Sequence, residues 1–183
     1  MGHLKADALS AGLEYSEVSK LELGTNMMSS LNGKNIISRL GRQVIELNLE
    51  NNELGKSDEF SDALVKHIIG GRFILQGLNL SQNYITDQQV HSICSALGTK
   101  NNHTLKKLKL SKNLLTVKAA KSIRDLFINS STKLCELDLS WNNIWAKGGA
   151  AIAQILKEDL SLRVVDLSWN CIGRGLQQGE VGE

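Results

Sequence analysis

The chain has 183 residues and contains no proline, and its aromatic residues are limited to three tryptophans, two tyrosines and three phenylalanines. An average protein carries roughly 5% proline, so this absence argues against a proline-rich linker and against a hinged two-domain protein. No apolar run approaches the roughly 18 residues that a membrane-spanning helix needs. We therefore expect one domain with no membrane contact.

Cysteine is scarce as well. Cys94, Cys135 and Cys171 are an odd number and no two of them are close in sequence. This pattern argues against a disulfide framework and a zinc site and favours a reducing compartment. The sequence thus predicts a cytoplasmic protein.

Charge of one sign is not in excess either. Lys and Arg number 21 and Asp and Glu number 19, for a net charge of +2, which is too balanced to favour nucleic acid or an anionic membrane as a partner. The four histidines fall in different parts of the chain, and no metal-ligand, phosphate-loop or nucleophile-elbow motif is present. We expect no enzyme activity, no cofactor and no metal.

One phrase recurs along the chain in place of such motifs. It has the form Leu-x-x-Leu-x-Leu-x-x-Asn-x-Leu, with other apolar residues replacing some leucines. The phrases start near residues 18, 44, 75, 105, 134 and 162. Their asparagines are Asn26, Asn52, Asn83, Asn113, Asn142 and Asn170, at successive spacings of 26, 31, 30, 29 and 28 residues. Repeats of this length indicate a stacked architecture.

Each phrase predicts a short strand followed by a turn. Leu-x-Leu alternation places the leucines on one face of a strand, and the asparagine amide can satisfy backbone groups where the chain leaves the sheet. Apolar residues then recur at about every fourth position, which predicts a helix in each repeat. Examples are Leu115, Ala119, Ile123 and Phe127, and also Ile144, Gly148, Ile152 and Leu156. The segment after Asn52 has two extra residues, which accounts for the 31-residue spacing.

These six phrases resemble the leucine-rich repeats of the ribonuclease-inhibitor-like subtype. The sequence Leu-Asp-Leu-Ser-Trp-Asn at 137–142 is most similar to the repeats of NOD-like receptor arrays and of small cytosolic leucine-rich repeat proteins. The resemblance implies an α/β fold, a right-handed β-α solenoid (a leucine-rich repeat horseshoe). Its parallel sheet would form the concave face and its helices the convex face, and protein partners usually bind the concave face.

The boundaries predicted from the repeats are one leucine-rich repeat domain over 1–176 and a flexible tail over 177–183. Residues 1–17 read as the helix of a partial repeat. Neither end carries an obvious polar cap, which an isolated solenoid needs. The chain is therefore predicted to be a fragment or isoform of a longer array, or to have an end covered by a partner, and end-to-end self-association is left open.

Candidate partner-binding residues come from the variable positions of the phrases. Trp141 and Trp169 immediately precede their asparagines and are predicted to project from neighbouring strands, about 5 Å apart. Two interpretations stay open for them: an interface, since exposed indoles are enriched there, or packing over the edge of their own repeat. The neighbouring charged candidates form an acidic and a basic group: Glu136, Asp138 and Asp166, and Lys107, Lys109 and Lys112. Lys107 and Lys109 can pair with Glu136 and Asp138 in the adjacent strand, or the lysines can contact a partner directly.

The function expected from this pattern is a scaffold that binds a protein partner through the concave face. The family resemblance leaves three alternatives. They are a GTPase-activating regulator similar to the Ran activator, a fragment of a NOD-like sensor array, and a ciliary or cytoskeletal component. The acidic tail of the Ran activator has no counterpart here, because Gln177–Glu183 contains only two acidic residues.

Overall fold

The structure is a computed structural model that describes residues 3–13, 16–72, 74–99 and 104–173. Six strands of three residues alternate with helices along the chain. The strands are β1 (Lys20–Glu22), β2 (Glu46–Asn48), β3 (Gly77–Asn79), β4 (Lys107–Lys109), β5 (Glu136–Asp138) and β6 (Val164–Asp166). The helices are α1 (His3–Leu13), α2 (Ser30–Ser38), the 3-10 helix η1 (Leu54–Lys56), α3 (Glu59–Ile69), α4 (Asp87–Leu97), α5 (Val117–Asn129) and α6 (Ala146–Glu158).

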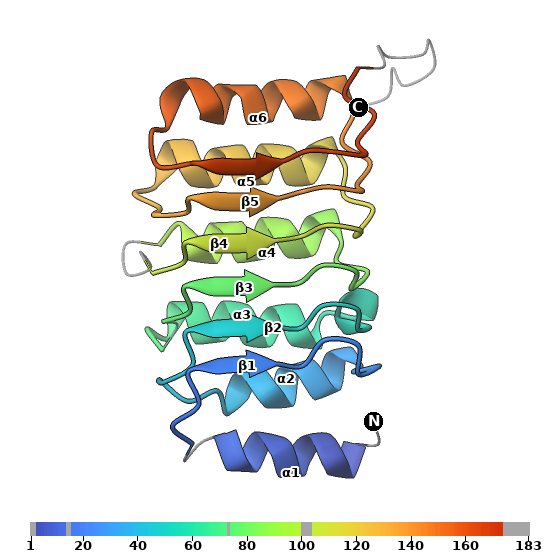
Figure 1. Cartoon of the computed structure of the whole chain (residues 1–183), viewed down its shortest axis with the longest axis vertical. Coiled ribbons are helices and arrows are strands. Elements are labelled where there is room, and N and C mark those ends of the chain that lie inside the picture. Colours follow the sequence, from blue (N-terminus) through green and yellow to red (C-terminus); the bar gives the residue numbers. More distant parts are fainter. Residues whose placement is uncertain (1–2, 14–15, 73, 100–103, 174–183) are drawn as a thin grey trace.

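The strands form one parallel sheet in the order in which they occur in the chain. The middle residue of each strand lies in register with the middle residue of the next: Leu21, Leu47, Leu78, Leu108, Leu137 and Val165. The described helices all lie on one side of this sheet and stack in the same order as the strands (Figure 1). Among the described residues nothing covers the face of the sheet that points away from the helices, which we call the open sheet face. The predicted α/β solenoid is confirmed.

The buried stripe of each helix packs against the leucines of the sheet. The four residues predicted for α5, from Leu115 to Phe127, are all buried. The prediction for α6 is right at Ile152 but wrong at Leu156, which is exposed, while Ile155 is fully buried. The reason is that a four-residue step overshoots the 3.6 residues of a helical turn, so the buried stripe moves back by one residue.

The 31-residue spacing between Asn52 and Asn83 is explained by η1. The residues after Asn52 form this single 3-10 turn before α3 begins, and its Leu54 and Gly55 are buried. A β-carbon on Gly55 would lie 2.3 Å from the Tyr84 carbonyl oxygen. The extra residues therefore bring the backbone of η1 directly against the turn of the next repeat.

The repeated asparagines join neighbouring repeats through buried hydrogen bonds. The Oδ1 atom of Asn113 accepts the backbone N–H groups of Asn83 and Ile85 at 2.9 and 3.0 Å. Its Nδ2 atom donates to the carbonyls of Leu80 and Leu110, both at 3.0 Å. Asn52 and Asn142 repeat this pattern. Each such side chain fixes the turn of its own repeat onto that of the preceding one.

The ends of the array agree in part with the predictions. The helix expected within 1–17 is α1, which packs against α2 and ends at the buried Leu13. The tail predicted over 177–183 lies outside the described residues. No described helix is long and apolar enough to cross a membrane.

Candidate protein-binding surface

Trp141 and Trp169 lie in turns at the carboxyl edge of the sheet, by which we mean the edge where the strands end. Their placement on strands was a wrong prediction, since β5 ends at Asp138 and β6 at Asp166. Both tryptophans adopt left-handed backbone conformations, with φ angles of 54° and 56°. Such a conformation costs an L-residue roughly 1–2 kcal/mol, so the turn must be held by surrounding contacts.

The predicted proximity of the two indoles is confirmed. Their ring centroids are 4.3 Å apart and their planes differ by 14°. The Lys112 ammonium lies 5.9 Å from the Trp141 ring centroid, within reach of a cation–π interaction. Trp141 is 47% exposed and Trp169 is 70% exposed. Trp141 is thus covered in part by its neighbours, while Trp169 remains mostly open to solvent.

The third tryptophan belongs to the start of α6. Trp145 occupies the N-cap position of this helix, and its indole N–H donates to Asn143 Oδ1 at 2.7 Å. It is half-buried. Its polar atom is therefore already used within the chain.

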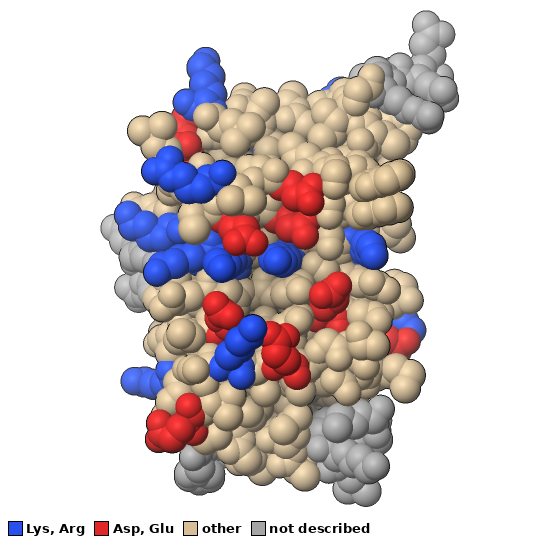
Figure 2. Space-filling view, in the orientation of Figure 1, with Lys and Arg blue, Asp and Glu red and all other residues tan. Residues whose placement is uncertain are grey.

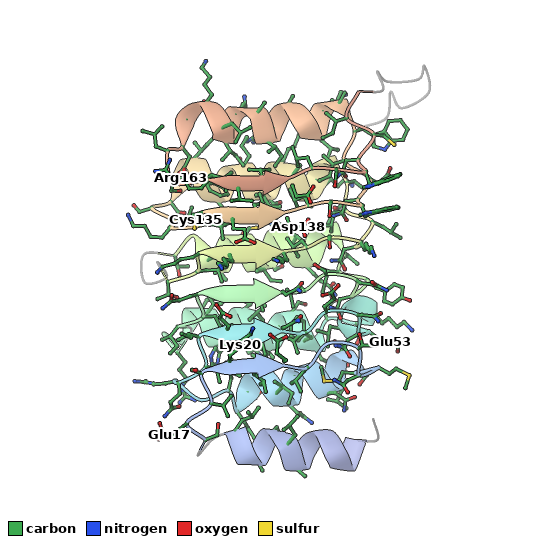
Figure 3. All side chains as sticks on the ribbon, viewed as in Figure 1. Glu17, Lys20, Glu53, Cys135, Asp138 and Arg163 are labelled. Carbon is green, nitrogen blue, oxygen red and sulfur yellow. The ribbon has the colours of Figure 1, made fainter. Side chains whose placement is uncertain are left out.

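Asp138 and Asp166 each stabilise the turn that carries the next tryptophan. Asp138 Oδ1 accepts the backbone N–H of Ser140 at 2.9 Å and the Ser140 hydroxyl at 2.7 Å. Asp166 Oδ1 accepts the backbone N–H of Ser168 at 2.9 Å. The Ser168 hydroxyl, followed by its backbone N–H, holds the pKa of Asp166 below its usual range. Both carboxylates carry negative charge beside the tryptophans, and Asp138 lies on the open sheet face near the end of β5 (Figure 3).

Two of the candidate lysines, Lys107 and Lys109, converge on one acidic residue. Lys107 Nζ lies 3.8 Å and Lys109 Nζ 3.6 Å from the two carboxylate oxygens of Glu136. Cross-strand pairing is therefore present, but both pairs end on Glu136 and none on Asp138. Since Lys107 and Lys109 are about half exposed, each pair contributes about 0–1 kcal/mol.

The open sheet face carries its charges in bands. Basic side chains gather over β4 and acidic ones over β5 and β6, while over β1 and β2 acidic side chains surround a basic one (Figure 2). This basic residue is Lys20, which pairs with Glu22 at 2.9 Å. A shallow hollow over β1 to β5 lies among these charges. Gly77 in β3 has no side chain to fill it, and the residues around it include Glu46, Asn79 and Lys107. Most of the residues that line the hollow are charged or polar, so it offers mainly polar contacts.

Three further exposed residues at the carboxyl edge were missed by the sequence analysis. Met27, Tyr84 and Leu114 directly follow the asparagines of their repeats and are 77%, 57% and 77% exposed. Their φ angles of 51°, 60° and 60° are also left-handed. The signal available in the sequence was a large apolar residue at a position where other repeats have Glu53 or Asn143.

The described residues offer no candidate metal site and no activated cysteine nucleophile. They contain no cluster of three or more potential metal ligands. All three cysteines are free, and burial together with the charge of Asp125 raises the pKa of the Cys94 thiol to about 12. That thiol stays protonated at neutral pH and is a poor nucleophile.

Comparison with known proteins supports the repeat assignment. A family model described as Leucine Rich repeat matches residues 101–123, 130–153 and 159–174. These three segments are leucine-rich repeats. They contain β4, β5 and β6 together with the lysine, acidic and tryptophan residues described above.

A solved structure shows the same fold over most of the chain. The structure entitled Leiomodin-1 Actin-Binding Site 2 superposes with a TM-score of 0.56 and 23% sequence identity, over 75% of this chain and 76% of that chain. At this identity the superposition shows that the two chains share a fold. No curated protein matches the sequence.

Proposed function

We propose that this chain is a scaffold of the ribonuclease-inhibitor-like subtype that binds a protein partner through the open sheet face and its carboxyl edge. The observation that carries the proposal is the exposed, stacked pair Trp141–Trp169. Aromatic side chains of this size dominate the energetics of protein interfaces when a partner buries them. The partner would be a cytoplasmic protein, in keeping with three free cysteines.

The charges beside the tryptophans would select the partner and orient it. Asp138 and Asp166 flank the tryptophans on the sheet side, and Lys107 and Lys109 lie one strand away around Glu136. Charged groups at the border of an interface affect the association rate and the choice of partner more than the affinity. The apolar pair is therefore the anchor, and the charged bands supply specificity.

The test is affinity capture from a cytosolic extract with matched variants of the whole chain. One bait carries Trp141→Ala with Trp169→Ala, and another carries Lys107→Glu, Lys109→Glu and Lys112→Glu. A charge-changing control on the helical side carries Lys118→Glu with Lys121→Glu, both exposed. Circular dichroism melts establish that every bait is folded.

We expect the tryptophan variant to lose a partner that the wild-type chain and the control retain. The lysine variant should bind the same partner more weakly and with a changed salt dependence. If the folded tryptophan and lysine variants capture the same proteins as the wild type, the proposal is wrong. If the tryptophan variant does not fold, the indoles serve the packing of their own repeats.

A further inference from the structure

Four large apolar side chains line the carboxyl edge in four successive repeats. They are Tyr84, Leu114, Trp141 and Trp169, and we call them the rim strip. Each is adjacent in sequence to the asparagine of its turn, each has a left-handed φ, and each is between 47% and 77% exposed. Met27 is separated from the strip by the repeat that carries Glu53, and Glu53 lies at the same edge of the sheet (Figure 3).

The backbone under the strip is held rigidly. Asn113 and Asn142 bond across the turns of repeats three to five, and Asn170 continues the pattern with a 3.0 Å bond from Ile144 N–H. The side chains therefore emerge from fixed points, one per repeat. A surface arranged before binding loses less conformational entropy when a partner arrives.

The strip consists of two offset pairs, since Tyr84 and Leu114 follow their asparagines whereas Trp141 and Trp169 precede theirs. The spacing between successive repeats, and between the two tryptophan rings, is close to the pitch of an α-helix. Parallel strands are about 4.8 Å apart, and the Trp141 and Trp169 rings are separated by 4.3 Å. A helix presents one row of side chains at intervals of about 5.4 Å, one interval per turn. A β-strand presents the side chains of one face at about 6.6 Å intervals, which would fall out of step with the repeats within two residues.

Charge is asymmetric along the strip. On the sheet side, Asp138 and Asp166 lie in the two repeats that carry the tryptophans, and each accepts a hydrogen bond from the backbone of its turn. Lys112, the cation at the other end of this pair, is already placed over the Trp141 ring. A partner therefore meets negative charge along the sheet side of the tryptophans.

From this geometry we propose that the rim strip binds an amphipathic helix of another protein, lying across the ends of the strands. Three to four turns of that helix would place apolar residues at i, i+4, i+7 and i+11 against the strip. Arg or Lys on the border that faces the sheet would pair with Asp138 and Asp166. This inference rests on the proposed function and names the shape and charge of its partner.

The experiment is a selection of peptides from a random 16-residue display library against the whole chain. The enriched peptides are synthesised and their affinities measured by fluorescence anisotropy, with circular dichroism in the bound state. We expect apolar residues at helical spacing with Arg or Lys on one border, and helical signal on binding. Leu114→Ser and Trp169→Ala should each weaken binding about tenfold, the usual loss for a central apolar contact.

Two matched variants distinguish specific binding at the rim strip from non-specific hydrophobic binding. Leu156→Ser removes an exposed apolar side chain from α6, on the helical side, and should leave the affinity unchanged. Asp166→Asn keeps the carbonyl oxygen that accepts the Ser168 N–H but removes the charge. It should weaken binding several-fold at 50 mM salt and very little at 1 M salt, where the screening length falls to about 3 Å.

The peptide experiment can contradict the helix proposal without contradicting the proposed scaffold function. Enriched peptides without helical spacing, no enrichment, or binding insensitive to Leu114→Ser and Trp169→Ala would each overturn the helix proposal. If the tryptophan pair is still needed to capture a cytosolic protein in those cases, the scaffold function stands with another binding mode. If neither the strip nor the sheet face affects any partner, both proposals are wrong.

Discussion

At the scale of single residues, the buried asparagines are the groups that connect one repeat to the next. A backbone N–H or carbonyl that is buried without a partner costs about 1–3 kcal/mol, and each turn of this chain would contain several such groups. The amide of Asn113 satisfies four of them with good geometry. The recurrence of asparagine at this position thus follows from the hydrogen-bonding needs of the turns, without reference to any ligand.

Replacement of Asn113 by alanine is expected to destabilise the chain strongly. The N–H groups of Asn83 and Ile85 and the carbonyls of Leu80 and Leu110 would lose this partner. We expect the free energy of unfolding to fall by about 3 kcal/mol or more, measured by urea denaturation followed by circular dichroism. The matched control is Asn26→Ala, because within the described residues the Asn26 amide donates to the Gly24 carbonyl of its own turn and not to a neighbouring repeat.

For Asn26→Ala we expect a loss below about 1 kcal/mol. Equal losses in the two variants would contradict the assignment of the asparagine to bonding between repeats. The result would then reflect only the preference of asparagine for turns.

At the scale of secondary-structure elements, the close approach between η1 and the following turn is a constraint that only glycine meets. The β-carbon of an alanine at Gly55 would lie 2.3 Å from the Tyr84 carbonyl oxygen and 2.5 Å from the Ile85 nitrogen. These are backbone atoms of an adjacent element, so no side chain can rotate away. The two elements must separate to accept any larger residue.

Gly55→Ala is therefore expected to lower the free energy of unfolding by about 2–3 kcal/mol, as overpacking of a tight contact does. Gly12→Ala in α1 is the control, since nothing lies within 4 Å of its β-carbon position. That substitution should stabilise the chain by about 0.5–1 kcal/mol through helix propensity. Thermal melts of the two variants measure both effects. A neutral Gly55→Ala would mean that η1 is not packed against the Tyr84 turn.

Sequence patterns predicted the strands and helices well where apolar residues recur at a single regular interval. The Leu-x-Leu phrases located all six strands, and the apolar residues from Leu115 to Phe127 gave the buried side of α5 correctly. The prediction failed at Leu156 because a fixed step of four residues was applied over three turns. It also failed for the strand placement of Trp141 and Trp169, because left-handed φ angles at bulky residues leave no signature in composition.

The candidate site was predicted less completely than the fold. Contact between Trp141 and Trp169 followed from the repeat spacing, and a pairing of lysines with Glu136 followed from strand register. The hydrogen bonds of Asp138 and Asp166 to the turns were not foreseen, although Asn48 and Asn79 occupy the same position and accept equivalent bonds. The binding roles of these residues remain predictions. Tyr84 and Leu114 were not predicted, because the predicted surface contained the residues before the asparagines and these two follow theirs.

At the scale of the whole molecule, stability is shared unequally along the stack. Each repeat contacts only its neighbours, so an internal repeat is stabilised from two sides and a terminal one from one side. The burial of the strands follows this rule. Leu137 and Leu139 of the fifth repeat are fully buried, whereas Val165 and Leu167 of the sixth are only partly buried.

Backbone hydrogen bonding shows the same difference between the fifth and sixth repeats. The Leu139 N–H donates to the Asp166 carbonyl and the Trp141 N–H to the Ser168 carbonyl, both at 2.9 Å. The corresponding amides of Leu167 and Trp169 face the edge of the sheet, where no further strand is present in the described part of the chain. An unpaired strand edge is also where another molecule can add.

Hydrogen exchange at single-residue resolution should therefore separate the two repeats. In dilute solution we expect the amides of Leu139 and Trp141 to exchange only when their hydrogen bonds to the sixth repeat open, and those of Leu167 and Trp169 to exchange at least about a hundredfold faster because they face the unpaired edge of the sheet. Slow exchange of all four amides at every protein concentration would contradict this gradient. Slow exchange of Leu167 and Trp169 that appears only as the concentration is raised would show that β6 pairs with a second molecule, and the mass measured by analytical ultracentrifugation would then increase over the same range.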